Sequence, residues 1–425
     1  MEYTYSYKGI GYLRNKLERK RKRVLLRYEY YEMKERTRHD VLLAPPWLKD
    51  IYKSAVGWCA KSVDTLADRL VFTGFDNDYF NAMQIFNMNN PDVLFDSAIR
   101  ESLIASCSFV QVSHGDGDEL TPKLSVITAY DATGVIDEFT GLLKEGYAVL
   151  DRDDNGSPIL EAYFTADGTY YYQGNTLIQT EENPAPYPLL VPIIYRPTSR
   201  RPFGHSRISR AAMAYTDMAK NTIQRAEISS EFYCFPQKWV SGLDPEADPM
   251  DAWRASMSAM LRFDKDQDGD KPTLGQFNQQ SMAPFMDMLK TAVGLMCGET
   301  GLTMDDLGFP TSNPSSAEAI KASHESLRLI ARSAQRSYGT AFANVGYISA
   351  CVRDDNDYSR VLVADYKALW QPVFEPDASM LSTVGDGAIK INQAVPNFFN
   401  KANLQTITGI ESAEDEAISI EDVTE

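Results

Sequence analysis

Apolar residues spaced three or four positions apart predict a chain built mainly of helices. The longest series runs from Ser315 to about Val352, and its apolar members are Ile320, Leu327, Ile330, Ala334, Tyr338, Ala341, Val345 and Ile348. Ser315 and Glu318 have the spacing of a capping box, in which each side chain satisfies a free backbone N–H group at a helix start. The stretch predicts one helix roughly 55 Å long.

Shorter series predict helices over 14–38, 47–70, 92–107, 206–233, 249–261, 282–299, 378–394 and 401–407. The 206–233 helix should be capped by Ser206. It carries Ala212, Ala219 and Ala226 at every seventh position, and small side chains permit close packing between helices. Gly301 should end the 282–299 helix, because glycine is favoured just past a helix C-terminus.

Alternating apolar and polar residues predict antiparallel hairpins between 109 and 195, with strands around 109–112, 124–127, 146–150 and 169–172. Asp153-Asp154-Asn155-Gly156 should form one of the turns, since Asn and Gly both tolerate positive φ. A run of prolines should then end the sheet, namely Pro184, Pro186, Pro188, Pro192 and Pro197. Further short strands are expected at 237–240, 274–277 and 359–363. The fold class is therefore α+β, mainly α.

Charge is distributed unevenly along the 425 residues. The formal net charge is −17, yet the segment 14–38 is basic and contains the run Arg19, Lys20, Arg21, Lys22 and Arg23, whereas the last residues are acidic. A basic helix can bind nucleic acid, but a solvated helix face is the commoner meaning, and the acidic composition favours that interpretation. The uneven charge suggests contact surfaces.

Composition also indicates the cellular compartment in which the protein is made. With 44% hydrophobic residues the chain can bury a large core. Its five cysteines are far apart, which indicates reduced thiols in a cytoplasmic setting. The N-terminus lacks the apolar core of a signal peptide, and no apolar run approaches the ~20 residues of a membrane span. We therefore expect a protein soluble at synthesis, with no membrane partner.

Motifs of catalysis are missing from the sequence. It has no phosphate-binding GxxxxGK[ST] loop, no GxSxG elbow and no histidine pair at metal-ligand spacing. Asp264, Asp266, Asp268 and Asp270 match only half of a calcium loop, and a solvated turn explains them better. Asp305-Asp306 leaves one enzymatic alternative, a Mg²⁺-dependent DNA-processing enzyme. We expect no cofactor and no metal.

The order of elements, together with two helix openings, resembles the portal proteins of tailed bacteriophages over almost the whole chain. The openings are Phe203-Gly204-His205-Ser206-Arg207-Ile208 and Asn313-Pro314-Ser315-Ser316-Ala317-Glu318-Ala319-Ile320. The resemblance implies a portal fold with a wing over 1–202, stem helices over 203–233 and 282–300, a clip over 234–281, a tunnel loop over 301–314, a long helix and wing return over 315–376, and a crown with an acidic tail over 377–425.

By the same resemblance, the chain should form a homo-oligomeric ring, usually a dodecamer, at one capsid vertex of the virion, assembled in the host cytoplasm. Double-stranded DNA would pass through it without sequence specificity. Expected partners are the terminase large subunit, a head-completion adaptor, and the major capsid and scaffolding proteins. The partner-binding clip residues would be Lys238, Asp264, Asp266, Asp268 and Asp270.

The segment between the returning stem helix and the long helix should face the channel and move. Its DNA-facing residues would be Met304, Asp305, Asp306, Leu307, Gly308 and Phe309. Gly301 and Gly308 give it backbone freedom, and Pro310 and Pro314 keep it out of helix. We also expect an acidic channel that repels the duplex, with the basic N-terminal helix on the outer wing, facing capsid protein or packaged DNA.

Overall fold

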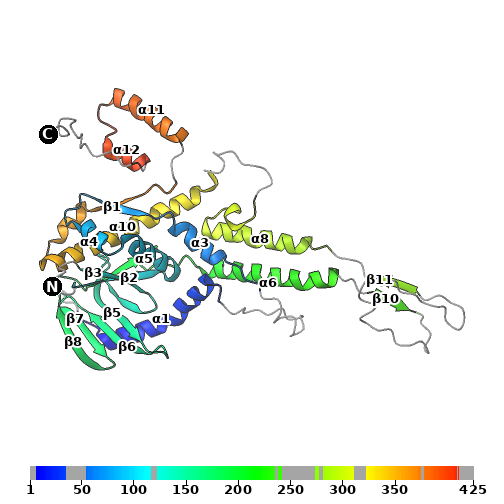
Figure 1. The fold of residues 1–425 in the computed structure, drawn as a ribbon, viewed down its shortest axis with the longest axis horizontal. Coiled ribbons are helices and arrows are strands. Elements are labelled where there is room, and N and C mark those ends of the chain that lie inside the picture. The colour runs from blue at the N-terminus through cyan, green and yellow to red at the C-terminus, as the bar shows by residue number, and fades with distance from the viewer. Residues whose placement is uncertain are drawn as a thin grey trace, which may run out of the picture.

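The computed structural model describes residues 6–34, 54–115, 122–234, 238–241, 273–276, 281–310, 322–374, 378–408 and 410. It is a mixed fold of helices and antiparallel strands, as the sequence predicts. A body of sheets and helices carries two long helices that project from it side by side (Figure 1). Helices α11 (Ala378–Ala394) and α12 (Lys401–Thr408) lie above the body in this view.

Two sheets form the centre of the body. The larger has the order β4-β5-β6-β7-β8 and is an antiparallel meander of Ala132–Ile136, Leu143–Arg152, Pro158–Phe164, Gly168–Gln173 and Thr176–Glu182. The smaller has the order β3-β2-β9, with strands Lys123–Thr128, Cys107–Ser113 and Leu190–Ile194. All four strands expected between 109 and 172 are present.

Helix α10 (Glu325–Asp354) is the central helix of the body. Its buried Tyr338, Phe342 and Tyr347 face the rest of the core, and it packs on β2, β9 and β12. Gly339 lies against β12, where an added Cβ would be 3.1 Å from the Cβ of Ala368. The predicted capping box at Ser315 lies outside the described residues.

Helix α5 (Pro91–Ala105) follows the prediction closely. Helix α3 spans Trp58–Ala67, and residues 54–57 before it are not helical, so the predicted helix over 47–70 is too long. Helix α1 (Ile10–Tyr31) begins earlier than predicted. It ends before 38 because Met33 takes a φ of 58°, which no α-helix accommodates.

Two local predictions are wrong. Residues 359–363 are not a strand, because Arg360–Asp365 forms a 3-10 helix. The prolines do not end the sheet: β9 contains Pro192, which an edge strand tolerates because its missing N–H is not needed there. The predicted turn Asp153–Gly156 is present between β5 and β6, and Gly156 takes the positive φ, of 78°, whereas Asn155 does not.

The sequence patterns also missed a small sheet and one helix. Strand β1 (Phe72–Asp76) pairs antiparallel with β12 (Lys367–Trp370), close to helix α4 (Ala82–Met88). Phe72 and Trp370 are joined edge to face with ring centroids 5.6 Å apart. This pairing connects the region after α10 to the N-terminal half of the body.

Candidate functional site

The projecting pair consists of α6 (Arg210–Cys234) and α8 (Ala283–Thr300), which pack along each other. Ala212, Thr216 and Ala219 of α6 are fully buried, as are Ala292 and Val293 of α8. The small side chains of α6 let the helices approach closely, as the alanine spacing predicted. Gly301 ends α8 with a φ of 72°, which confirms its predicted capping role.

Helix α8 exposes apolar side chains. Met286, Met288 and Leu295 have exposed fractions of 49%, 40% and 44%. Helix α8 projects from the body beside α6 (Figure 1). Met288 and Leu295 are seven positions apart and therefore share one face of α8, where exposed apolar side chains indicate contact with another protein surface.

At the far end of the pair, β10 (Lys238–Ser241) and β11 (Thr273–Gln276) form a two-stranded antiparallel hairpin. Both strands were predicted within one residue. Lys238 lies in β10, opposite Gln276. The other expected clip residues, Asp264, Asp266, Asp268 and Asp270, lie outside the described part of the chain, as does the helix predicted over 249–261.

The segment 203–209, which precedes α6, forms a joint between α6, β9 and α5. Gly204 has a φ of 72° and lies so close to β9 that an added Cβ would be 2.1 Å from the carbonyl oxygen of Tyr195. The His205 N–H donates to that same oxygen at 2.9 Å. Ser206 donates to the Ile104 carbonyl at 2.5 Å. The helix cap is therefore Ser209, whose Oγ accepts the Ala212 N–H, and the prediction of Ser206 is wrong.

Arg207 connects this joint to α3 and α8, a role that the sequence patterns did not reveal. Its side chain is buried, its Nε donates to the Ser62 carbonyl at 2.5 Å, and its Nη2 donates to the Thr300 carbonyl at 2.7 Å. Burial lowers the pKa of its guanidinium. Ser209 adds a hydrogen bond of 2.6 Å to Glu299. The bases of α6 and α8 are thus fixed to each other and to α3.

The expected tunnel loop is partly packed into the body. Leu302 and Leu307 are buried, whereas Met304, Asp305 and Gly308 are exposed and Phe309 is half-buried. Residues Asp305–Leu307 form one turn of 3-10 helix, although the sequence predicted no helix here. Residues 311–314 lie outside the described residues.

Asp306 holds this turn together. Its carboxylate accepts hydrogen bonds from the backbone N–H and the hydroxyl of Thr303, both at 2.9 Å. His324, just before α10, lies 3.9 Å from it. Within the described residues, no group of three or more His, Cys, Asp or Glu side chains gathers where it could hold a metal ion. The bonds to Thr303 give Asp306 a structural role in this turn.

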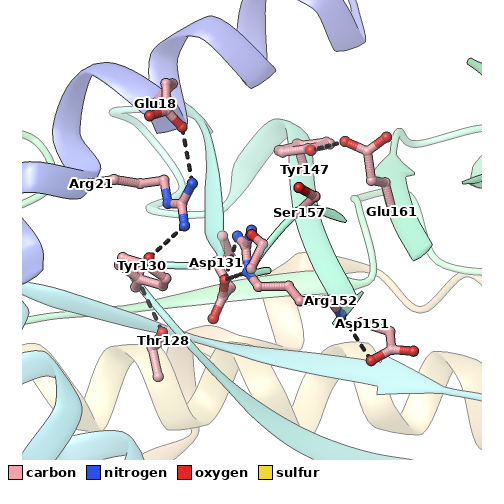
Figure 2. A network of polar contacts seen from close by, with 12 residues as sticks. Glu18, Arg21, Thr128, Tyr130, Asp131, Tyr147, Asp151, Arg152, Ser157 and Glu161 are labelled. Carbon is pink, nitrogen blue, oxygen red and sulfur yellow. Dashed lines mark hydrogen bonds and ion pairs between the residues drawn. The ribbon is translucent and has the colours of Figure 1, made fainter. Parts of the chain in front are cut away.

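The basic run of α1 is divided between two faces. Arg19, Lys22 and Arg23 are exposed, whereas Lys20 donates to the Ala132 carbonyl at 2.8 Å and lies over the ring of Phe203, 5.6 Å from its centroid. Arg21 bonds to Glu18 and to the hydroxyl of Tyr130 (Figure 2). The prediction of a solvated face is therefore wrong for Lys20 and Arg21.

Lys16 lies one turn before Lys20 and also points inward. Its amine donates to the Gly134 carbonyl at 2.6 Å, above the same Phe203 ring. Burial, with a smaller effect of the charge on Lys20, lowers the pKa of Lys16 to about 8. The cations of α1 thus join the helix to the larger sheet and to the joint before α6.

The chain is similar to a known protein family, to curated proteins and to solved structures. The model of the family described as "Phage portal protein, SPP1 Gp6-like" matches residues 10–361, which is most of the chain. This chain belongs to the phage portal protein family. The match confirms the resemblance carried by the two helix openings.

Two curated relatives, from Mycobacterium phages L5 and D29, are named portal protein. Each is 24% identical to this chain, over 329 and 320 residues respectively. The matched part covers 70% of this chain and 65% of each relative. The chain thus spans just under two-thirds of the length of the portal proteins that it matches.

Among solved structures, a chain from the virion of a native gene transfer agent particle is similar over 91% of this chain and 99% of its own length, with 12% identity and a TM-score of 0.46. A chain from the neck of an empty particle of this kind, computed with C6 symmetry, has the same identity and TM-score over 86% of this chain and 93% of its own length. Among the described residues, no helix has the length and apolar character needed to span a lipid bilayer.

Proposed function

We propose that this portal family member assembles into a ring-shaped channel at one capsid vertex, through which double-stranded DNA is packaged and later ejected. The observation that carries the proposal is the pair α6 and α8. It projects from the body, is held at its base by Arg207, and exposes Met288 and Leu295 on one face of α8.

A ring explains these exposed residues. In a ring each copy contacts its neighbour through two different surfaces, and such contacts close on themselves when the rotation between copies divides a full turn. Met288 and Leu295 on α8 would pack against α6 or the body of the next copy. A dodecamer is the assembly that we expect from the family resemblance.

The hairpin β10–β11 is the part of the described chain farthest from the body along the pair (Figure 1). We assign it to the clip, which would dock the terminase large subunit and later the head-completion adaptor. Capsid and scaffolding proteins would meet the body. The turn 301–310 at the base of α8 would face the channel through Met304 and Asp305, which are exposed.

The enzymatic alternative based on Asp305 and Asp306 is less well supported. Asp306 is engaged with Thr303 and lies near His324. A family match over 10–361 also favours a structural role. Incubation with plasmid and Mg²⁺ tests this point, because an enzyme would nick the DNA and would lose that activity in Asp305→Ala or Asp306→Ala.

Electron microscopy and native mass spectrometry of the purified chain test the ring. We expect closed rings from the unchanged protein and monomers from Met288→Glu/Leu295→Glu, because two buried charges at the contact oppose assembly. Met88→Glu, at a residue of α4 with an exposed fraction of 66%, is the matched control and should still form rings. Rings from the α8 double variant would refute this contact, and a parent protein that stays monomeric would refute the ring.

A further inference from the structure

A groove of about 780 Å³ runs between the first half of α10 and the segment 363–370. Leu329, Gly339 and Ala343 line it from the helix, and Val363 and Trp370 line it from the other side. Leu329 has an exposed fraction of 56%. One face of the Trp370 ring packs on Phe342, at a centroid distance of 5.9 Å. The floor of the groove is therefore apolar and open to a partner.

The rim of the groove is positively charged. Arg332, Arg336 and Lys367 line it, and the described lining residues include no Asp or Glu. Within the described chain none of these three cations forms an ion pair within 4 Å. Arg332 is nevertheless close enough to Glu325 to lower the pKa of that carboxyl, in addition to the larger effect of Arg328. By contrast, Arg328 on the same helix is paired with Glu325 at 2.6 Å. In a protein of net charge −17, three cations around one apolar groove thus have no ion-pair partner among the described residues.

The sequence contains a segment of complementary chemistry. Residues 411–425 carry the acidic side chains Glu411, Glu414, Asp415, Glu416, Glu421, Asp422 and Glu425, interspersed with the apolar residues Ala413, Ala417, Ile418, Ile420 and Val423. The segment contains no Lys or Arg. Its carboxylates match the rim of the groove and its isoleucines match the floor. A phosphate backbone would match only the rim.

The position of α12 agrees with this pairing. The segment follows Ile410, soon after the end of α12, and in Figure 1 α11 and α12 lie on the side of α10 where β1 and β12 pair. Fifteen residues span at most roughly 50 Å when extended. A docked tail would cover the surface of α10 and β12 and would keep acidic charge away from other surfaces.

We propose that the acidic C-terminal segment 411–425 docks in the groove between α10 and β12, with its carboxylates on Arg332, Arg336 and Lys367 and its isoleucines against Leu329 and Trp370. The docked segment then covers this surface instead of remaining a solvated tail. The inference does not depend on ring formation.

Zero-length carbodiimide cross-linking of the full chain tests the proposal, because this reagent joins an amine only to a carboxylate in contact with it. Peptide mass spectrometry should locate a link between Lys367 and a carboxylate of 411–425. Its yield should fall roughly threefold or more in Arg332→Gln/Arg336→Gln, as expected for the loss of two partly exposed ion pairs. It should also fall at 0.5 M NaCl, where charges on a surface are screened.

Arg328→Gln is the matched control, since it removes an already paired cation from the same helix and should leave the yield unchanged. Mixing chains of two isotope compositions tells whether the tail docks on its own copy or on a neighbour, and either result supports the proposal. No link from Lys367 to 411–425, a link that survives the double variant, or a link from Lys367 to carboxylates elsewhere in a second copy would overturn it.

Discussion

Arg207, at the entrance to α6, donates a hydrogen bond of 2.7 Å to the carbonyl of Thr300, the last residue of α8. The helices that leave the body and return to it are therefore joined by one buried guanidinium. Thr300 lies at a helix C-terminus, where backbone carbonyls have no partner within the helix. The Arg207 side chain supplies that partner and fixes where the projecting pair begins.

Replacing Arg207 with Met should destabilise the protein strongly. The variant keeps much of the side-chain volume but leaves the carbonyl of Thr300 without its donor and removes a bond to Ser62, and burying such groups unpaired costs about 2 kcal/mol or more. Chemical denaturation measures the loss. Arg210→Gln, at an exposed residue three positions later, should change the free energy of unfolding by less than about 0.5 kcal/mol. Equal stability of the two variants would contradict the role of Arg207.

Gly204→Ala should also destabilise the protein, through steric overlap as well as backbone strain. The new Cβ would overlap the Tyr195 carbonyl oxygen, so the joint must open. Gly156→Ala is a matched control, because Gly156 has a similar φ of 78° but nothing within 4 Å of an added Cβ. The free energy of unfolding should fall by about 1 kcal/mol in the control, from strain alone, and should fall by clearly more in Gly204→Ala. Equal losses would mean that the close approach to Tyr195 is relieved at no cost.

The helices and hairpins could be predicted because each is encoded in a local period. The pairing of β1 with β12 could not, since its partners lie at opposite ends of the chain and each strand is short. The role of Arg207 could not be predicted for a similar reason, because its partners are distant in the sequence. Its identity was visible within Gly204-His205-Ser206-Arg207, but nothing in that stretch shows that its hydrogen-bond acceptors come from α3 and α8.

The basic run shows a second limit of sequence patterns. Arg19, Lys20, Arg21, Lys22 and Arg23 look alike in sequence, and the overall acidity favoured a solvated face. A helix distributes five successive residues around its whole circumference, so some of them must point inward. Only the position of Phe203 and of the Ala132 carbonyl decides that Lys20 does so.

The lowered pKa of Lys16 should make stability depend on pH. In the unfolded chain this amine titrates near its ordinary value of about 10.4, and in the folded protein at about 8. Between these values the unfolded state binds more protons, so the free energy of unfolding should rise with pH. Lys20, whose pKa is lowered by burial, acts in the same direction.

Urea denaturation of the parent and of Lys16→Met at several values from pH 7 to 10.5 measures this effect. The difference in stability, parent minus variant, should increase between about pH 8 and 10.5, by up to about 2 kcal/mol, and should be constant below pH 7. Other titrating groups are shared and cancel. A constant difference over the whole range would show that the Lys16 amine is not perturbed.

The turn at the base of α8 should report the presence of DNA in the channel. Met304 has an exposed fraction of 40% and lies on a 3-10 turn whose other side, at Leu302 and Leu307, is buried. A thiol in Met304→Cys should react with a maleimide slowly in DNA-filled particles and quickly in empty ones. The parent protein gives the background of the native cysteines. Equal rates in both particles would count against a DNA-facing turn.

The last prediction concerns charge, where this family member looks least like a DNA-binding protein. Proteins that neutralise phosphates bind DNA tightly at low salt and lose affinity steeply as salt rises, because binding releases counterions. A channel through which DNA slides must instead bind the duplex weakly. The chain has a net charge of −17, and the basic run of α1 presents only Arg19, Lys22 and Arg23 to solvent. We therefore expect an acidic channel along which the duplex slides, with weak binding confined to the exposed face of α1.

Fluorescence anisotropy of a linear duplex with isolated rings tests this expectation. Binding should be weak, and Arg19→Gln/Lys22→Gln/Arg23→Gln should abolish most of it and lower the salt dependence by about one released counterion for each phosphate that is no longer neutralised. Lys61→Gln/Lys390→Gln/Lys401→Gln removes three exposed cations from other helices and should have little effect. Tight, salt-sensitive binding that survives the α1 substitutions would mean that surfaces outside α1 grip the DNA, and the sliding duplex would have to be abandoned.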